Sequence, residues 1–63
     1  MNIANLIDGL LILQNHDPDA SVCAEHDQLF AGSSEPLSPE DASRMEALDW
    51  SRDIDGDGWL AWV

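Results

Sequence analysis

The stretch Asp53-Ile54-Asp55-Gly56-Asp57-Gly58 has the residue types and spacing of the first half of a calcium-binding loop. Carboxylates occupy loop positions one, three and five, Gly occupies position six, and the aliphatic Leu60 occupies position eight. Ca²⁺ takes about six to eight oxygen ligands, and position twelve normally supplies a bidentate Glu. That position would lie one residue beyond Val63, and a Trp-rich segment stands where the outgoing helix should begin. We therefore favour an acidic hairpin turn over a calcium site formed by Asp53, Asp55 and Asp57.

Cys23, His26 and Asp27 are close in the sequence, and could form half of a zinc site or a nucleophile with its base. A structural zinc ion needs four ligands, and His16 provides no second close pair to complete the Cys-x-x-His spacing. Residues three apart in a strand lie on opposite faces, which separates Cys23 from His26. No glycine-rich elbow suggests an oxyanion hole. We expect a small buried Cys, two ordinary histidines, no cofactor and no enzymatic activity.

The charge of the chain points to a class of partner. Thirteen Asp and Glu residues stand against two Arg and no Lys, which gives a formal net charge of −11 on 63 residues. A hydrophobic content of 44% with three Trp is unlike that of a disordered acidic tail. Charge of one sign steers association with surfaces of the opposite sign, whereas nucleic acid and anionic lipid would repel this chain. We predict a folded protein whose acidic surface binds a strongly basic partner.

The length of the chain limits what it can contain. Sixty-three residues fit a single domain, residues 1–63, with one small core and no deep substrate cavity. One Cys excludes an intramolecular disulfide and fits a reducing compartment. The apolar run Leu10–Leu13 is too short to cross a bilayer, and the N-terminus lacks the features of a signal peptide. The sequence therefore predicts a soluble, cytoplasmic, monomeric domain.

Residues 2–15 are expected to form the first helix, with Asn2 as its N-cap. Its apolar residues fall on one broad face: Ile3, Leu6, Ile7, Leu10, Leu11 and Leu13. Gly9 and Ile12 fall on the opposite face, so we expect Ile12 to be exposed and available to a partner. Gly9 costs about 0.5–1 kcal/mol relative to Ala inside a helix, which suggests that its surroundings favour a small residue.

A hairpin and a second helix should follow. Val22–Gly32 alternates as a β-hairpin with Asp27-Gln28 at its corner. The second helix should begin after the N-cap Ser38, with Pro39 at its first position and a buried stripe that includes Met45. Glu40 and Asp41 fill its first turn, and Arg44 can pair with Glu40 one turn earlier.

A second hairpin is expected from Trp50 to Val63, with its turn at Asp55–Gly58. Trp59 and Trp62 cannot share one face of a strand, so we expect two Trp in the core and one exposed as an anchor for a partner. The expected fold is α+β, with two helices packed on one face of a small antiparallel sheet in the order α-β-β-α-β-β.

Several segments resemble a group of small acidic proteins carried by phages and other mobile elements. These segments are the DPDASVCAEHD stretch of residues 17–27, Leu29–Gly32, the Ser-Pro-Glu-Asp helix start and the Asp49-Trp50 pair. The group includes anti-CRISPR inhibitors of type I surveillance complexes, and the chain is similar in size and charge to one proposed against type I-C. The resemblance implies helices on an antiparallel sheet, a bacterial host, and a protein partner rather than a substrate. It implies no residue roles.

Charge and resemblance together predict an inhibitor that blocks a DNA-binding surface of a type I CRISPR surveillance complex by mimicking DNA. The phosphates of duplex DNA supply one negative charge per roughly 1.7 Å of its axis. A groove of Lys and Arg that binds these phosphates can also accept closely spaced carboxylates. The candidate contacts are Glu40, Asp41, Glu46, Asp49, Asp53, Asp55, Asp57 and the apolar Ile12. The alternatives are a calcium-responsive module and an acidic accessory protein with an apolar interface.

Overall fold

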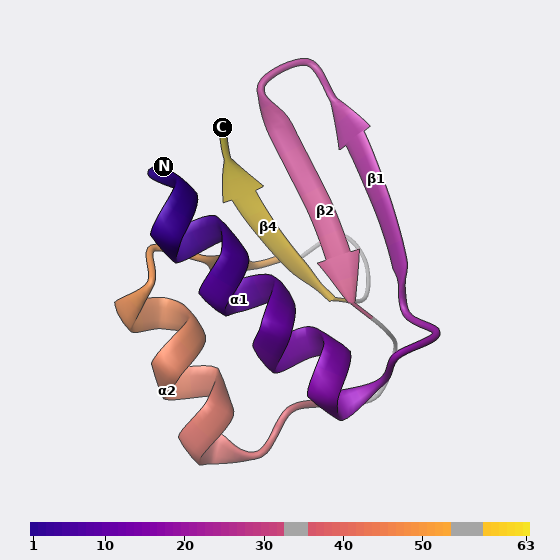
Figure 1. The fold of residues 1–63 in the computed structure, drawn as a ribbon, viewed down its shortest axis with the longest axis vertical. Coiled ribbons are helices and arrows are strands. Elements are labelled where there is room, and N and C mark those ends of the chain that lie inside the picture. The colour runs from indigo at the N-terminus through magenta and orange to yellow at the C-terminus, as the bar shows by residue number, and fades with distance from the viewer. Residues whose placement is uncertain (33–35, 54–57) are drawn as a thin grey trace.

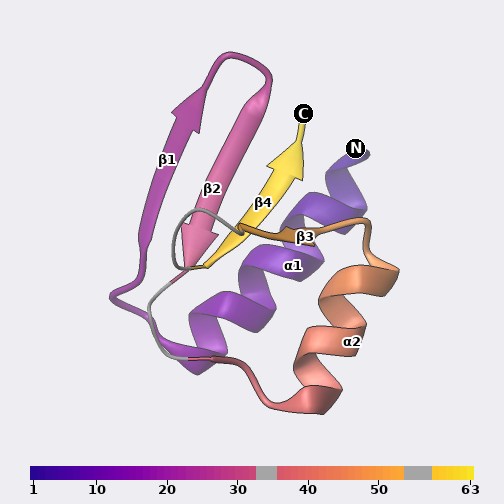
Figure 2. The same ribbon diagram turned by 180° about the vertical axis from the view of Figure 1, so that it is seen from behind.

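The computed structural model contains two helices and four strands, and it describes residues 1–32, 36–53 and 58–63. The elements are α1 (Ile3–His16), β1 (Ser21–Glu25), β2 (Gln28–Gly32), α2 (Pro39–Ala47), β3 (Ser51–Arg52) and β4 (Trp59–Trp62). The strands form one antiparallel sheet in the order β1-β2-β4-β3, and both helices lie on the same side of it (Figures 1 and 2). The predicted α+β class and the order α-β-β-α-β-β are confirmed.

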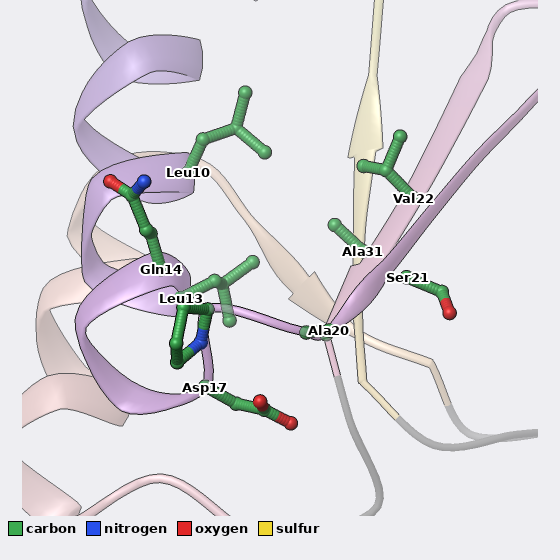
Figure 3. Close-up of a pocket in the computed structure, with 10 residues that line it drawn as sticks. Leu10, Leu13, Gln14, Asp17, Ala20, Ser21, Val22 and Ala31 are labelled. Atoms are coloured by element: carbon green, nitrogen blue, oxygen red, sulfur yellow. The ribbon is translucent and has the colours of Figure 1, made fainter.

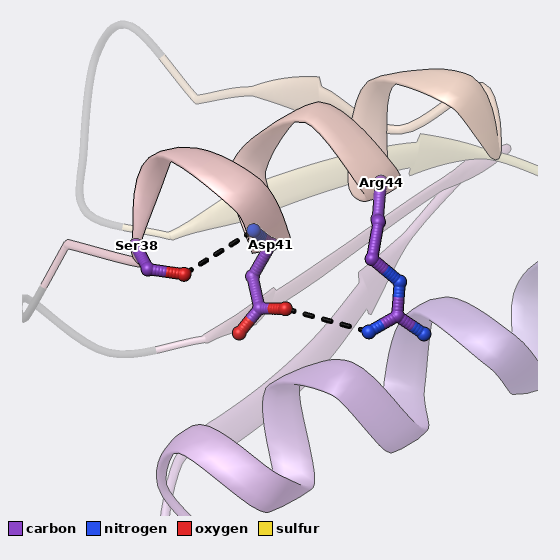
Figure 4. Close-up of polar contacts among 3 residues, drawn as sticks. All are labelled: Ser38, Asp41 and Arg44. Atoms are coloured by element: carbon purple, nitrogen blue, oxygen red, sulfur yellow. Dashed lines mark hydrogen bonds and ion pairs between the residues drawn. The ribbon is translucent and has the colours of Figure 1, made fainter.

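Short polar side chains determine where both helices begin, as predicted. The Asn2 Oδ1 accepts a hydrogen bond of 2.7 Å from the Asn5 N–H, and the Ser38 Oγ accepts one of 3.2 Å from the Asp41 N–H (Figure 4). Pro39 then takes the first position of α2, where its missing N–H has no intrahelical partner to lose.

The helix α1 buries a face that matches the predicted one only in part, because Leu6, Leu10 and Leu13 pack on the core but the rest of the predicted stripe does not. The side that carries Gly9 and Ile12 is buried, and Ile12 is only 5% exposed. In contrast, Ile3 is 74% exposed and Ile7 and Leu11 are each 49% exposed. The prediction that Ile12 faces a partner was therefore wrong, because this residue belongs to the core.

Trp50 explains which face of α1 is buried. Its side chain is 2% exposed, and its indole Nε1–H donates a hydrogen bond of 3.1 Å to the backbone oxygen of Asn5. A Cβ added to Gly9 would overlap the five-membered ring of this indole. The Nε1 edge of the indole therefore packs directly on the α1 backbone, and the predicted need for a small residue at Gly9 is confirmed.

The hairpin of β1 and β2 closes one residue earlier than predicted. Glu25 pairs with Gln28, so the turn consists of His26 and Asp27, whereas we had expected Asp27-Gln28. His26 has φ 55°, the positive value found at the first central residue of a type II′ turn.

The sheet presents one covered and one open side. The residues of β2 and β4 that face the helices are Leu29, Ala31, Trp59 and Ala61. They pack with Ile12, Leu13, Met45 and Trp50 to form the core. Neither of the described helices covers the opposite side (Figure 2).

Candidate functional site

The described acidic residues that we predicted as partner contacts lie on α2 and in the segment after it. Glu40, Asp41 and Glu46 belong to α2, Asp49 follows its last turn, and Asp53 follows β3. Three of these side chains are exposed, while Asp41 and Asp53 are partly buried. Asp55 and Asp57, also predicted as contacts, lie outside the described residues.

The three acidic residues of α2 are spread around the helix and do not share one face. At about 3.6 residues per turn, Glu40 points outward, while Asp41 and Glu46 lie on opposite flanks of the buried Met45. Arg44 Nη1 is 3.4 Å from Asp41 Oδ1 (Figure 4), so the ion pair joins Arg44 to Asp41 and the expected pairing with Glu40 was wrong. Because Asp41 is paired, Glu40 and Glu46 are the carboxylates of α2 best placed to meet a basic partner.

Asp49 ends α2 in a conformation that normally belongs to Gly. Its φ is 68°. Its N–H donates a hydrogen bond of 3.1 Å to the backbone oxygen of Glu46, and the Trp50 N–H donates one of 3.0 Å to the backbone oxygen of Met45. This pattern is a Schellman motif, whose left-handed residue is usually Gly. A carboxylate at this end of a helix also meets the negative pole of the helix dipole. The fold would therefore be more stable with Gly than with Asp at this position. The presence of Asp is consistent with a role for its charge in binding.

Replacing Asp49 by Gly should raise the free energy of unfolding by about 1 kcal/mol, because it relieves both the left-handed backbone and the dipole repulsion. Urea denaturation followed by circular dichroism measures this change. Asp49→Asn is the matched control, because Asn tolerates the conformation and removes only the charge; it should give a smaller gain. A lower stability of Asp49→Gly would contradict this account of the helix end.

A second group of carboxylates lies at the free end of the β1–β2 hairpin, where sequence reasoning did not place candidate contacts. Glu25 ends β1, Asp27 is in the turn, and both are exposed. The hairpin turn and the start of α2 lie at opposite ends of the molecule (Figure 1). The strand alternation that ends at Glu25 was the signal that could have identified this group. Acidic residues thus occur at both ends of the long axis.

Carboxylates far outnumber arginines on the described surface. Arg44 is paired with Asp41, and the guanidinium carbon of Arg52 lies 5.8 Å from the ring centroid of Trp59. No charged side chain is buried among the described residues. The chain carries a net charge of −11 and measures 27 Å along its longest axis, a length over which duplex DNA carries roughly 16 phosphate charges. The charge per unit length is therefore of the same order as that of DNA.

The residues that the sequence offered as half of a zinc site, Cys23, His26 and Asp27, do not form a metal-binding group among the described residues. Throughout residues 1–32, 36–53 and 58–63, no three His, Cys, Asp or Glu side chains are grouped so that they could hold a metal ion. Cys23 is exposed on β1, so the expectation that it would be buried was wrong. The Asp53 N–H donates a hydrogen bond of 3.2 Å to the backbone oxygen of Gly58, and this bond joins the two ends of the calcium-like stretch. Residues 54–57 of that stretch are not among those described.

The hollows of the described surface are small or shallow. The pocket between the end of α1 and the start of β1 has a volume of about 90 Å³ and is lined by Leu10, Leu13 and Val22, among others (Figure 3). Pockets for small molecules usually measure about 300–1,000 Å³, so this one is too small for most metabolites. A groove of about 490 Å³ between α1 and α2 is larger, but exposed residues such as Asp8 and Arg44 line it. It is therefore an open surface groove.

Within the part of the chain that is described, neither helix has the length and apolar character needed to cross a membrane. Comparisons of the chain with known protein families, with curated proteins and with solved structures found no match.

Proposed function

We propose that the protein is an inhibitor that binds a basic, DNA-binding surface on a protein complex and excludes DNA by presenting carboxylates in place of phosphates. The observation that carries this proposal is a net charge of −11 on a folded chain in which none of the described carboxylates is buried. The resemblance to mobile-element proteins suggests a type I CRISPR surveillance complex in the cytoplasm of a bacterial host as the target. The protein would act there as a monomer.

The arrangement of the charges supports a mimic of an extended polyanion. The first turn of α2, with Glu40, lies at one end of the long axis and the β1–β2 turn, with Glu25 and Asp27, lies at the other, while the C-terminal end of α2 that carries Glu46 and precedes Asp49 lies between them (Figure 1). A partner that tracks a DNA backbone holds cations along a groove, and it can meet both groups at once. Such an encounter is steered over long distances and weakens as salt screens the charges.

The test is a DNA-binding assay with a purified type I surveillance complex and labelled target duplex. We expect the protein to reduce DNA binding, the reduction to weaken as salt is raised, and excess duplex to displace the bound protein. A salt gradient on immobilised protein should release the complex at moderate salt. Inhibition that does not respond to salt, or a complex that binds protein and DNA together, would contradict DNA mimicry.

A further inference from the structure

The side of the sheet that faces away from both helices carries a set of apolar and acidic residues. Cross-strand pairing aligns them in two adjacent rows, and strand alternation directs them away from the core. We call this set the open sheet face; it consists of Cys23, Phe30 and Leu60 in one row and Glu25, Gln28 and Trp62 in the next.

Trp62 is the most conspicuous residue of the open sheet face. Its side chain is 53% exposed, whereas Trp59, three residues earlier in the same strand, is 4% exposed. The expectation of two core Trp residues and one exposed Trp is thus confirmed, and the exposed one is Trp62. A large aromatic surface of this kind is a frequent anchor of protein interfaces.

Carboxylates accompany Trp62 on this part of the surface. Glu25 and Trp62 are the two neighbours of Gln28 in one row, so their Cβ atoms lie about 10 Å apart. The Val63 N–H donates a hydrogen bond of 2.8 Å to the backbone oxygen of Asp27, which brings the acidic hairpin turn beside the end of β4. An exposed indole therefore shares one face of the sheet with Glu25, and the turn that carries Asp27 adjoins the end of its strand.

Neither arginine of the described chain neutralises the carboxylates near Trp62. Arg44 is on α2, and Arg52 is stacked on Trp59, whose side chain belongs to the covered side of the sheet. An exposed aromatic ring beside carboxylates is complementary to a guanidinium group, which stacks flat on the ring while its N–H groups donate to the acids. The ammonium of Lys is compact and strongly hydrated, and it makes this combination less well.

We propose that the open sheet face binds arginine side chains of the basic partner, with Trp62 as the stacking surface and Glu25 as the hydrogen-bond acceptor. The choice of a basic partner rests on the proposed function. The inference adds the part of the molecule that anchors the interface and the type of cation it selects. A second copy of this chain is excluded as the occupant, because it would oppose one net charge of −11 to another.

The test uses the full chain labelled with ¹⁵N and titrated separately with nona-arginine and nona-lysine at physiological salt. We expect nona-arginine to bind more tightly and to shift the Trp62 indole N–H and the amides of Phe30 and Leu60. Trp62→Ala should weaken nona-arginine binding about three- to thirtyfold. The matched control is Ile7→Ala, which removes an apolar side chain of similar exposure from α1 and should leave binding unchanged.

Glu25→Gln is a second variant, at an exposed position where loss of the carboxylate leaves the hairpin intact; it should also weaken nona-arginine binding. Equal affinity for the two peptides, equal affinity of Trp62→Ala and the unaltered chain, or shifts confined to α2 would each overturn the proposal. The proposed function fails by a different result, namely unimpaired DNA binding by the surveillance complex in the presence of the unaltered protein.

Discussion

Replacing Gly9 by Ala is expected to lower the free energy of unfolding by about 2–3 kcal/mol, although Ala is the better helix former. The added methyl group would overlap the indole of Trp50, which has no free space to move into because it is 2% exposed. Moving the ring would also break its hydrogen bond of 3.1 Å to the Asn5 oxygen. A domain of this size has a total stability of about 3–5 kcal/mol, so this single methyl group should bring it close to unfolding.

Urea denaturation followed by circular dichroism measures the effect of Gly9→Ala. Asn15→Ala is a suitable control, because it adds an Ala at an exposed position of the same helix and should change stability by no more than about 0.5 kcal/mol. The cost of Gly9→Ala should be smaller in a Trp50→Phe background, which lacks the five-membered ring. An unchanged or raised stability of Gly9→Ala would show that α1 does not pack on Trp50.

Reversing the two acidic residues at the end of α2 is the second change with a large expected effect. The double variant Glu46→Lys, Asp49→Lys should weaken inhibition of DNA binding by roughly ten- to hundredfold, because two contacts with a basic surface become repulsive. Both side chains are exposed, and the favourable position of Lys at the C-terminal end of a helix offsets the strain of a Lys in the left-handed conformation of Asp49, so the fold should remain intact. Inhibition of the purified complex and thermal unfolding measure the two effects separately.

The matched control for this experiment is Asp8→Lys, Asp19→Lys. These residues are also exposed, and each double variant changes the net charge from −11 to −7. The control variant should lose much less inhibition, since it changes only the overall electrostatic field of the protein. Equal losses in the two variants would show that total charge, and not the position of the acids on α2, determines binding.

Local signals in the sequence predicted much of the fold. Asn2 and Ser38 marked the helix starts because a cap depends only on its nearest neighbours. The buried face of α1 could not be predicted in this way, because apolar residues surround most of the helix. The deciding contact comes from Trp50, far along the chain, which packs where Gly9 leaves room.

The candidate site was predictable in composition but not in geometry. The carboxylates of α2 were evident, yet their spread around the helix and the ion pair of Asp41 with Arg44 depend on which side the core takes. Trp62 was one of two possible exposed Trp residues until strand pairing directed Trp59 inward. The left-handed backbone of Asp49 had no signal, because Gly is the usual residue there.

The position of β4 between β2 and β3 has a consequence for folding during synthesis on the ribosome. While residues 59–62 are still untranslated, β2 has no neighbour on one side and β3 has none at all. The core lacks Trp59 and Ala61 at that stage, so the helices have little apolar surface to dock on. We expect nascent chains that stop after α2 to be protease-sensitive, and the folded state to appear only after β4 has left the exit tunnel.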